Sequence, residues 1–142
     1  MILDTTYFLP LVGIKIRENL LLDIDLGRIN LRFEDVSLSL ITIFELQAKA
    51  TKLKIPPERI FRGVRTIINS FNIIPFYEER IIKIASELKE MLNDYIDCII
   101  LATAISSKEG LITEDEDILG LKDQIKKKYK IEVLSYNQLT RQ

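Results

Sequence analysis

The sequence predicts a single α/β domain built around a parallel sheet. Short apolar runs typical of buried strands alternate along the chain with longer segments whose apolar residues recur at helical spacing. The length of 142 residues is usual for one compact domain. No stretch rich in Pro, Gly or Ser marks a linker. We therefore expect residues 1–142 to fold as one unit, with a ligand site beyond the carboxyl ends of the strands.

In the first half of the chain, apolar runs bounded by polar residues predict strands, and apolar residues three or four positions apart predict helices. Pro56-Pro57 separates two of these helices, because proline interrupts a helix but suits the first turn of the next one. The segment 14–30 has only approximate helical spacing, and Asp23, Asp25 and Gly27 leave its end open. The expected elements are a strand over 1–3, a helix over 7–11, a strand over 36–40, helices over 41–54 and 57–71, and a short strand over 73–76.

The second half repeats the alternation. Residues 78–92 predict an amphipathic helix, whereas residues 95–105 are apolar nearly all round, so that this helix should be largely buried. We expect Gly110 to end it. Strands are then predicted over 111–113 and 130–134.

The amino-acid composition excludes several chemistries. The chain has no histidine and one cysteine, which removes an imidazole base, a Cys–His pair and a zinc site. A lone Cys98 cannot close an intrachain disulfide, so we expect a buried, reduced thiol and a cytoplasmic protein. The start of the chain has no basic leader, and no apolar run is long enough to span a membrane. A net charge of -1 provides no overall field to attract a polyanion.

Acidic residues stand at positions that the predicted fold would bring together. Asp4 follows the first strand, Asp115 follows the strand over 111–113, Asp97 lies at the head of the apolar helix, and Glu45 lies one turn into the helix after the second strand. Four clustered carboxylates repel one another unless cations offset their charge. Divalent cations such as Mg²⁺ or Mn²⁺ are the simplest remedy, and a pair about 3.5–4 Å apart cleaves phosphodiesters without a histidine.

Each acid also has a purely structural interpretation. Asp4 could cap the following helix, and Asp97 stands three residues after Asp94, the spacing of a helix start. Glu45 could lie on a solvated helix face. The acids of 113–117 could form an exposed turn capped by its threonine.

Taken together, four ordered segments resemble the motifs of PIN-domain ribonucleases, and most of all the VapC-type toxins. They are Ile2-Leu3-Asp4-Thr5-Thr6, Ser39-Leu40-Ile41-Thr42-Ile43-Phe44-Glu45-Leu46, Asp97-Cys98-Ile99-Ile100-Leu101-Ala102-Thr103-Ala104 and Leu111-Ile112-Thr113-Glu114-Asp115-Glu116-Asp117. The resemblance spans nearly the whole chain. It implies a Rossmann-like, three-layer α/β/α sandwich with a central parallel sheet, and hydrolysis of RNA phosphodiester bonds with one or two Mg²⁺ or Mn²⁺ ions.

The resemblance also implies roles for individual residues. Those that match the catalytic, metal-binding acids are Asp4, Glu45, Asp97 and Asp115. Asp117 matches a frequent additional metal ligand, and Thr6 and Thr113 match supporting hydroxyl residues. The chain departs from the family at Ile118, where an aromatic residue is common, and residues 14–35 match no family motif.

Other functions remain open at this stage. A receiver-like or dehalogenase-like phosphotransfer domain also gathers acids above a parallel sheet, but Asp4-Thr5-Thr6 lacks a second acid two residues on, and Glu45 has no role in that scheme. A PIN nuclease that processes RNA without being a toxin is an alternative to a toxin with an antitoxin. A third is a module that binds RNA or protein without cutting.

The expected partners are an RNA substrate, a possible antitoxin protein and a second copy of the chain. The segment 41–71 carries more apolar residues than one buried helix face needs, which favours a homodimer interface there: Ile60, Phe61, Val64, Ile67, Ile68 and Phe71. Candidates for holding the RNA backbone are Lys49, Lys52, Lys54, Arg62, Arg65 and Lys126-Lys127-Lys128. Each of these basic residues could equally belong to a solvated helix face.

Overall fold

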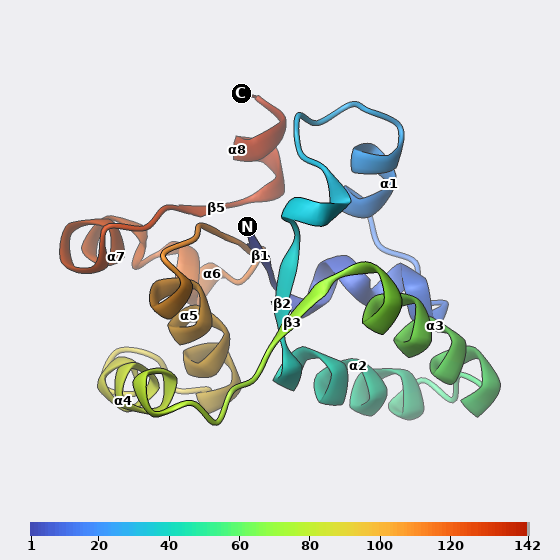
Figure 1. Ribbon diagram of the computed structural model, residues 1–142, viewed down its shortest axis with the longest axis horizontal. Coiled ribbons are helices and arrows are strands. Elements are labelled where there is room, and N and C mark those ends of the chain that lie inside the picture. Colours follow the sequence, from blue (N-terminus) through green and yellow to red (C-terminus); the bar gives the residue numbers. More distant parts are fainter. Residues whose placement is uncertain (142) are drawn as a thin grey trace.

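A five-stranded sheet forms the centre of the protein, and all of its strands run parallel in the order β3-β2-β1-β4-β5. The computed structural model describes residues 1–141 (Figure 1). The strands are β1 (Ile2–Leu3), β2 (Ser37–Ser39), β3 (Asn72–Ile74), β4 (Leu111–Ile112) and β5 (Val133–Leu134). The chain builds the sheet outward from β1 to β3 and then continues on the other side of β1. The strand order therefore switches between β1 and β4, which is where open α/β sheets bind ligands.

Helices connect the strands. They are η1 (Thr5–Val12), α1 (Leu20–Asp25), η2 (Phe33–Asp35), α2 (Leu40–Lys52), α3 (Pro57–Ser70), α4 (Glu79–Leu88), α5 (Tyr95–Ser107), α6 (Glu116–Leu119), α7 (Lys122–Tyr129) and α8 (Tyr136–Thr140), η1 and η2 being 3₁₀ helices. The sequence analysis did not predict α6, α7 or α8, whose few residues give little periodicity to detect. The expectation that Gly110 ends α5 is wrong. Lys108 takes the left-handed conformation at that helix end, with φ of 55°.

The two faces of the sheet carry separate hydrophobic cores, as a three-layer sandwich requires. Ile2 and Leu111 point into a core shared with α4, α5 and α7. Their neighbours Leu3 and Ile112 point into a core shared with η1, α1, α2 and α3, because successive side chains of a strand face opposite ways. Figure 1 shows α4 and α5 on one side of the sheet and α2 and α3 on the other. The predicted Rossmann-like α/β/α fold is confirmed.

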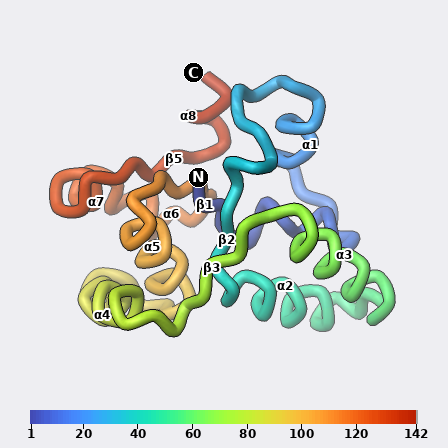
Figure 2. The backbone as a smooth tube through the Cα atoms, viewed as in Figure 1, coloured from blue at the N-terminus to red at the C-terminus, as the bar shows by residue number. Residues whose placement is uncertain are grey.

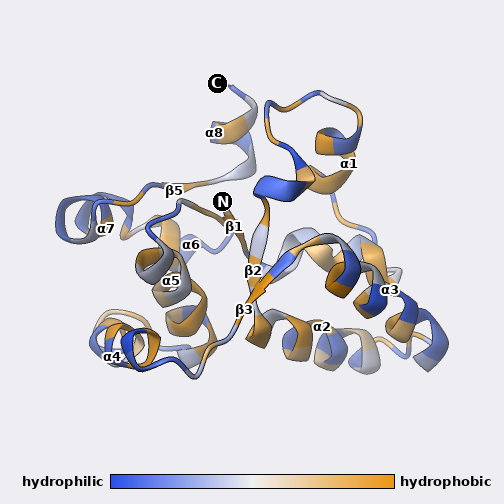
Figure 3. Ribbon diagram, in the orientation of Figure 1, coloured by the Kyte–Doolittle hydropathy of each residue, from blue (hydrophilic) through white to orange (hydrophobic). Residues whose placement is uncertain are grey.

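The helices differ in hydropathy according to their position. The central residues of α5, 98–105, are all buried, as its composition predicts, and the helix packs against α4. Figure 3 shows α7 as largely hydrophilic, and α3 with both hydrophilic and hydrophobic residues. The single cysteine, Cys98, is buried in α5 as a free thiol, and burial raises its pKa. No helix within residues 1–141 is both long and apolar enough to cross a membrane.

A close backbone contact brings α3 against η1. Gly63 is buried, and a Cβ added to it would lie 2.4 Å from the carbonyl oxygen of Leu11 and 2.8 Å from Cγ1 of Val12. Glycine is therefore the residue that allows this approach. The contact thus packs α3 against η1, the helix that follows β1.

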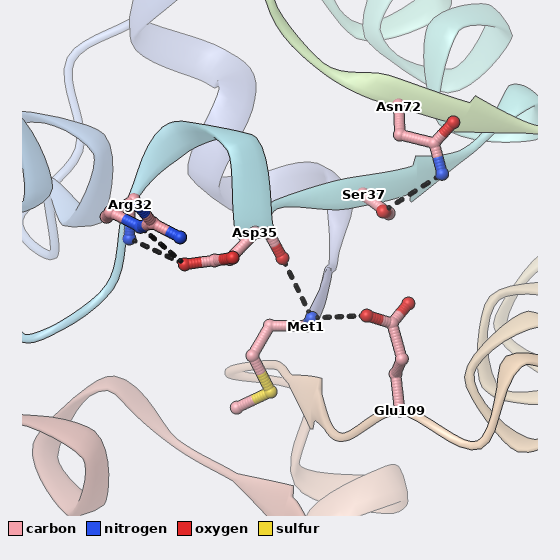
Figure 4. Close-up of polar contacts among 6 residues, drawn as sticks. All are labelled: Met1, Arg32, Asp35, Ser37, Asn72 and Glu109. Carbon is pink, nitrogen blue, oxygen red and sulfur yellow. Dashed lines mark hydrogen bonds and ion pairs between the residues drawn. The ribbon is translucent and has the colours of Figure 1, made fainter.

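Polar contacts fasten the edge of the sheet where the strands begin (Figure 4). The Met1 ammonium donates to the carbonyl oxygen of Asp35 at 2.9 Å and to Oε1 of Glu109 at 2.8 Å. The Asn72 amide donates to Oγ of Ser37 at 3.2 Å. These bonds join the starts of β1, β2, β3 and β4 at the edge opposite to that occupied by the acidic residues.

Candidate active site

Asp4 stands at the carboxyl end of β1, where it is buried and rigidly held. Its backbone N–H donates to the carbonyl oxygen of Ile112 in the neighbouring strand at 3.0 Å. One carboxylate oxygen, Oδ1, accepts the N–H of Thr5 at 2.7 Å, and the other, Oδ2, accepts the hydroxyl of Thr113 at 2.6 Å. Asp4 caps η1, as its structural interpretation proposes, but it does so from a buried position at the switch point of the sheet.

Thr113 links this carboxylate to the turn after β4. Its hydroxyl donates to Asp4 and also accepts the backbone N–H of Asp115 at 3.0 Å. Asp115 then caps α6, since its Oδ1 accepts the N–H of Ile118 at 2.9 Å. The turn is not fully exposed, because Thr113 has no solvent-accessible surface. A continuous chain of hydrogen bonds thus runs from the end of β1 to the start of α6.

Asp97 and Glu45 approach the same place from two helices. Asp97 lies in the first turn of α5, whose cap is Asp94, and Glu45 lies in the second turn of α2. Both are partly buried. The pKa of Asp97 is raised to about 7, first by burial and then by the negative charges of Asp115, Asp4, Asp94 and Glu45. The charges of the other three predicted acids thus reach Asp97.

The electrostatics of Asp4 lead to the same conclusion. Burial raises its pKa, the hydrogen bonds from Thr113 and Thr5 lower it, and the charges of Glu45 and Asp115 raise it. Within residues 1–141, no lysine, arginine or N-terminal amine forms an ion pair with Asp4, Glu45, Asp97 or Asp115. The repulsion among these acids is thus not offset by a cationic side chain.

The other predicted residues differ in position. Asp117 is exposed on α6 and is not among the acids that chiefly raise the pKa of Asp4 or Asp97. Thr6 is partly buried. Its neighbour Thr5, which the sequence analysis did not single out, is buried, and its hydroxyl donates to that of Thr42 on α2 at 3.3 Å. This contact joins the Asp4 turn to the helix that carries Glu45.

The predicted basic residues are exposed. Lys49 and Lys52 belong to the last turns of α2, beyond Glu45, and Arg62 and Arg65 belong to α3. The run 126–128 ends α7 shortly before β5 begins, so it lies toward the opposite edge of the sheet from Asp4. One of these lysines, Lys126, is already paired with Glu132 at 2.9 Å.

The acids do not form a closed coordination cage. Among residues 1–141, no three acidic or cysteine side chains converge closely enough to surround a metal ion. Their oxygen atoms are nonetheless the donors that Mg²⁺ and Mn²⁺ prefer. Mg²⁺ commonly uses one or two carboxylates, with waters and substrate phosphate completing its coordination. The donor set and its uncompensated charge fit such an ion.

Comparison with protein families matches the model of the PIN domain to residues 1–123. The chain belongs to the PIN-domain family. PIN domains are nucleases. A comparison with curated protein sequences gave no match.

Solved structures share the fold of this PIN domain along most of its length. A chain of a toxin–antitoxin complex from Klebsiella pneumoniae is 26% identical, with a TM-score of 0.62, and the alignment covers 84% of this chain and 91% of that one. A chain of FitAcB from Neisseria gonorrhoeae is 22% identical, with a TM-score of 0.70 and coverage of 97% and 99%. A chain of VapBC-5 from Mycobacterium tuberculosis is 19% identical, with a TM-score of 0.62 and coverage of 94% and 96%.

Proposed function

We propose that this PIN domain is an endoribonuclease that uses Mg²⁺ or Mn²⁺ to hydrolyse RNA. The observation that carries the proposal is the electrostatic coupling of Asp4 and Asp97 to the same two neighbours: Glu45 and Asp115 raise the pKa of both, and among residues 1–141 no cationic side chain forms an ion pair with any of these four acids. A histidine base is excluded by composition. When bound, a divalent cation supplies an activated water and stabilises the charge that develops on the phosphate.

The chain's own residues have distinct roles in this proposal. Asp4 contributes a carboxylate whose two oxygens are oriented by Thr5 and Thr113, so little reorganisation is needed to hold a cation. Asp97, Glu45 and Asp115 contribute further carboxylates from three separate elements. Thr6 remains a proposed supporting residue, and Asp117 a proposed additional ligand. One or two ions suit this set.

Cleavage of a labelled single-stranded RNA tests the proposal. We expect wild-type protein to cut it with Mn²⁺ or Mg²⁺, to stop when EDTA is added, and to resume when the metal is restored. The Asp97→Asn variant should lose cleavage, because an amide keeps the volume of the side chain but not the charge that attracts the ion. Asp123→Asn, which alters an exposed acid on α7, is the matched control and should cut normally. Cleavage by Asp97→Asn at the wild-type rate would contradict the assignment.

We further propose that the nuclease is the toxin of a toxin–antitoxin pair. The support is its likeness to a chain of a toxin–antitoxin complex, over 84% of this chain, and to a chain of a VapBC-family toxin–antitoxin system, over 94% of this chain. The alternatives are a PIN nuclease without an antitoxin, and a binding module. A small adjoining gene for a DNA-binding protein, whose co-expression relieves growth arrest by this nuclease, would support the toxin. Harmless expression of the active enzyme alone would contradict it.

A homodimer through α2 and α3 is the proposed state of the protein. Large apolar side chains of these helices are exposed, with 63% of Phe44, 60% of Phe61 and 52% of Ile68 accessible to solvent. A cavity of about 530 Å³ lies beside them, between the end of α2 and the start of α3, and is partly lined by Phe61 and Val64. Of the residues expected at this interface, Ile67 is fully buried in the monomer and belongs to its core instead.

A further inference from the structure

Glu114 stands between two residues of the acidic site, Thr113 and Asp115, yet its side chain has other partners. Its Oε2 accepts the hydroxyl of Tyr7 at 2.5 Å and the backbone N–H of Tyr136 at 2.9 Å. Glu114 is partly buried. The turn after β4 is thereby fastened to η1 on one side and to the start of α8 on the other.

The contact with Tyr7 is of a strong kind. Tyr7 has no solvent-accessible surface, and its hydroxyl donates to a carboxylate at a distance typical of a charge-assisted hydrogen bond. Burial raises the pKa of Tyr7, and the bond to Glu114 raises it further, so the phenol keeps its proton. Tyr7 follows Asp4 by three residues. The bond consequently ties the Asp4 turn to the Asp115 turn a second time, in addition to the bond through Thr113.

The contact with Tyr136 connects the site to residues 14–35. The Tyr136 hydroxyl donates to Oδ2 of Asp23 in α1, and Asp23 also accepts Nη1 of Arg28 at 3.2 Å. Asp23 is buried, although it is charged. Figure 2 shows α8 beside the segment that contains α1. Residues 14–35 therefore support α8, which lies beyond residue 123, where the family match ends.

We infer that Glu114 is a positioning residue, which holds Thr113 and Asp115 toward Asp4 and makes α8 part of the support of the site. Glu114 adds to the other restraints on this turn: Thr113 donates to Asp4 and to the carbonyl oxygen of Leu134, and the Asp115 carboxylate accepts the N–H of Ile118. Loss of Glu114 would leave the buried Tyr7 hydroxyl and the Tyr136 N–H without their acceptor. The effect on metal binding rests on the proposed function, whereas the effect on the turn does not.

Two substitutions of Glu114 distinguish a positioning role from direct coordination of the metal ion. Both hydrogen bonds end on the same oxygen of Glu114, so the carbonyl oxygen of a glutamine could accept both, whereas alanine accepts neither. We expect Glu114→Ala to weaken Mn²⁺ binding about tenfold or more, the usual cost of losing a partner that orients a ligand. Glu114→Gln should bind Mn²⁺ nearly as the wild type does. A direct ligand would instead lose its function in both variants.

Hydrogen exchange supplies a measurement that does not involve the metal. The Ile118 N–H is bonded to Asp115, so Glu114→Ala should speed its exchange while amides within α5 keep theirs. Glu87→Ala is the matched control, because it removes a tyrosine–glutamate bond, from Tyr129 at 3.1 Å, that lies outside the acidic site. It should alter neither Mn²⁺ binding nor exchange at Ile118.

Each outcome has a defined meaning. Equal damage by Glu114→Gln and Glu114→Ala overturns the inference, as does wild-type behaviour of Glu114→Ala in both measurements. If Glu114→Ala does not fold, Tyr7→Phe removes only the donating hydroxyl and should change Ile118 exchange in the same direction; unchanged exchange overturns the inference. If the wild type binds no Mn²⁺, the proposed function fails, and exchange at Ile118 alone decides the role of Glu114.

Discussion

Replacing Asp97 by asparagine should stabilise the metal-free protein at alkaline pH while abolishing cleavage. The folded protein raises the pKa of Asp97 from 3.8 to about 7, so between these values the folded state binds a proton that the unfolded chain has released. Stability must therefore fall as the pH rises through this window. Asparagine has no charge to lose, and the variant escapes that part of the decline.

The size of the effect follows from the shift. For a group fully shielded from water, a pKa difference of this extent corresponds to about 4 kcal/mol in the free energy of unfolding. Asp97 is only partly buried, and screening by water reduces the figure to about 2 kcal/mol. The charge also favours the first turn of α5 by about 0.3–1 kcal/mol, which asparagine forfeits. The expected net gain is about 1–2 kcal/mol at pH 8 and less than half of that at pH 5.

Urea denaturation of both proteins in EDTA, at pH 5 and pH 8, measures this difference. Asp123→Asn controls for the loss of any one negative charge and should show no pH-dependent gain. The reasoning is refuted if Asp97→Asn is destabilised by a similar amount at both pH values. That result would mean that the carboxylate acts as a helix-capping group whose loss is independent of its neighbours.

Three further substitutions test other parts of the structure. Thr113→Val removes the hydroxyl that bonds to Asp4 and Asp115, so urea denaturation should show a free energy of unfolding lower by about 1–3 kcal/mol. The pKa of Asp4 should rise further, because it loses a hydrogen bond that lowers it. An unchanged stability would mean that the bond is not formed in solution. Gly63→Ala should lower the melting temperature, although alanine usually favours a helix, because its Cβ would overlap the η1 backbone and cost about 1–3 kcal/mol. Phe61→Asp should convert the proposed dimer to a monomer in light scattering with little change in the fold, whereas a wild type of 16.5 kDa at micromolar concentrations would exclude the dimer.

Local patterns in the sequence are sufficient for most of the architecture. Strands such as 111–113 and helices such as 95–105 can be recognised in the sequence, because a buried strand and a buried helix each have a characteristic spacing of apolar residues. The three short helices α6, α7 and α8 escaped prediction, since four to eight residues contain too few turns to show a period. The end of α5 was misplaced because Lys108 adopts a conformation that usually favours glycine.

Part of the candidate site could also be predicted from the sequence, and part could not. The sequence by itself determined which acids follow the strands and helix starts, and therefore which carboxylates to propose for the site: Asp4, Glu45, Asp97 and Asp115. Only the tertiary structure decided how they are held: the bond from Thr113 to Asp4 joins residues 109 apart in the chain, and the bond from Tyr7 to Glu114 joins residues 107 apart. The pattern of apolar residues within one strand or helix indicates which of its residues are buried. It does not record a hydrogen bond between distant residues, whose donor and acceptor meet only after the sheet has brought two strand ends side by side.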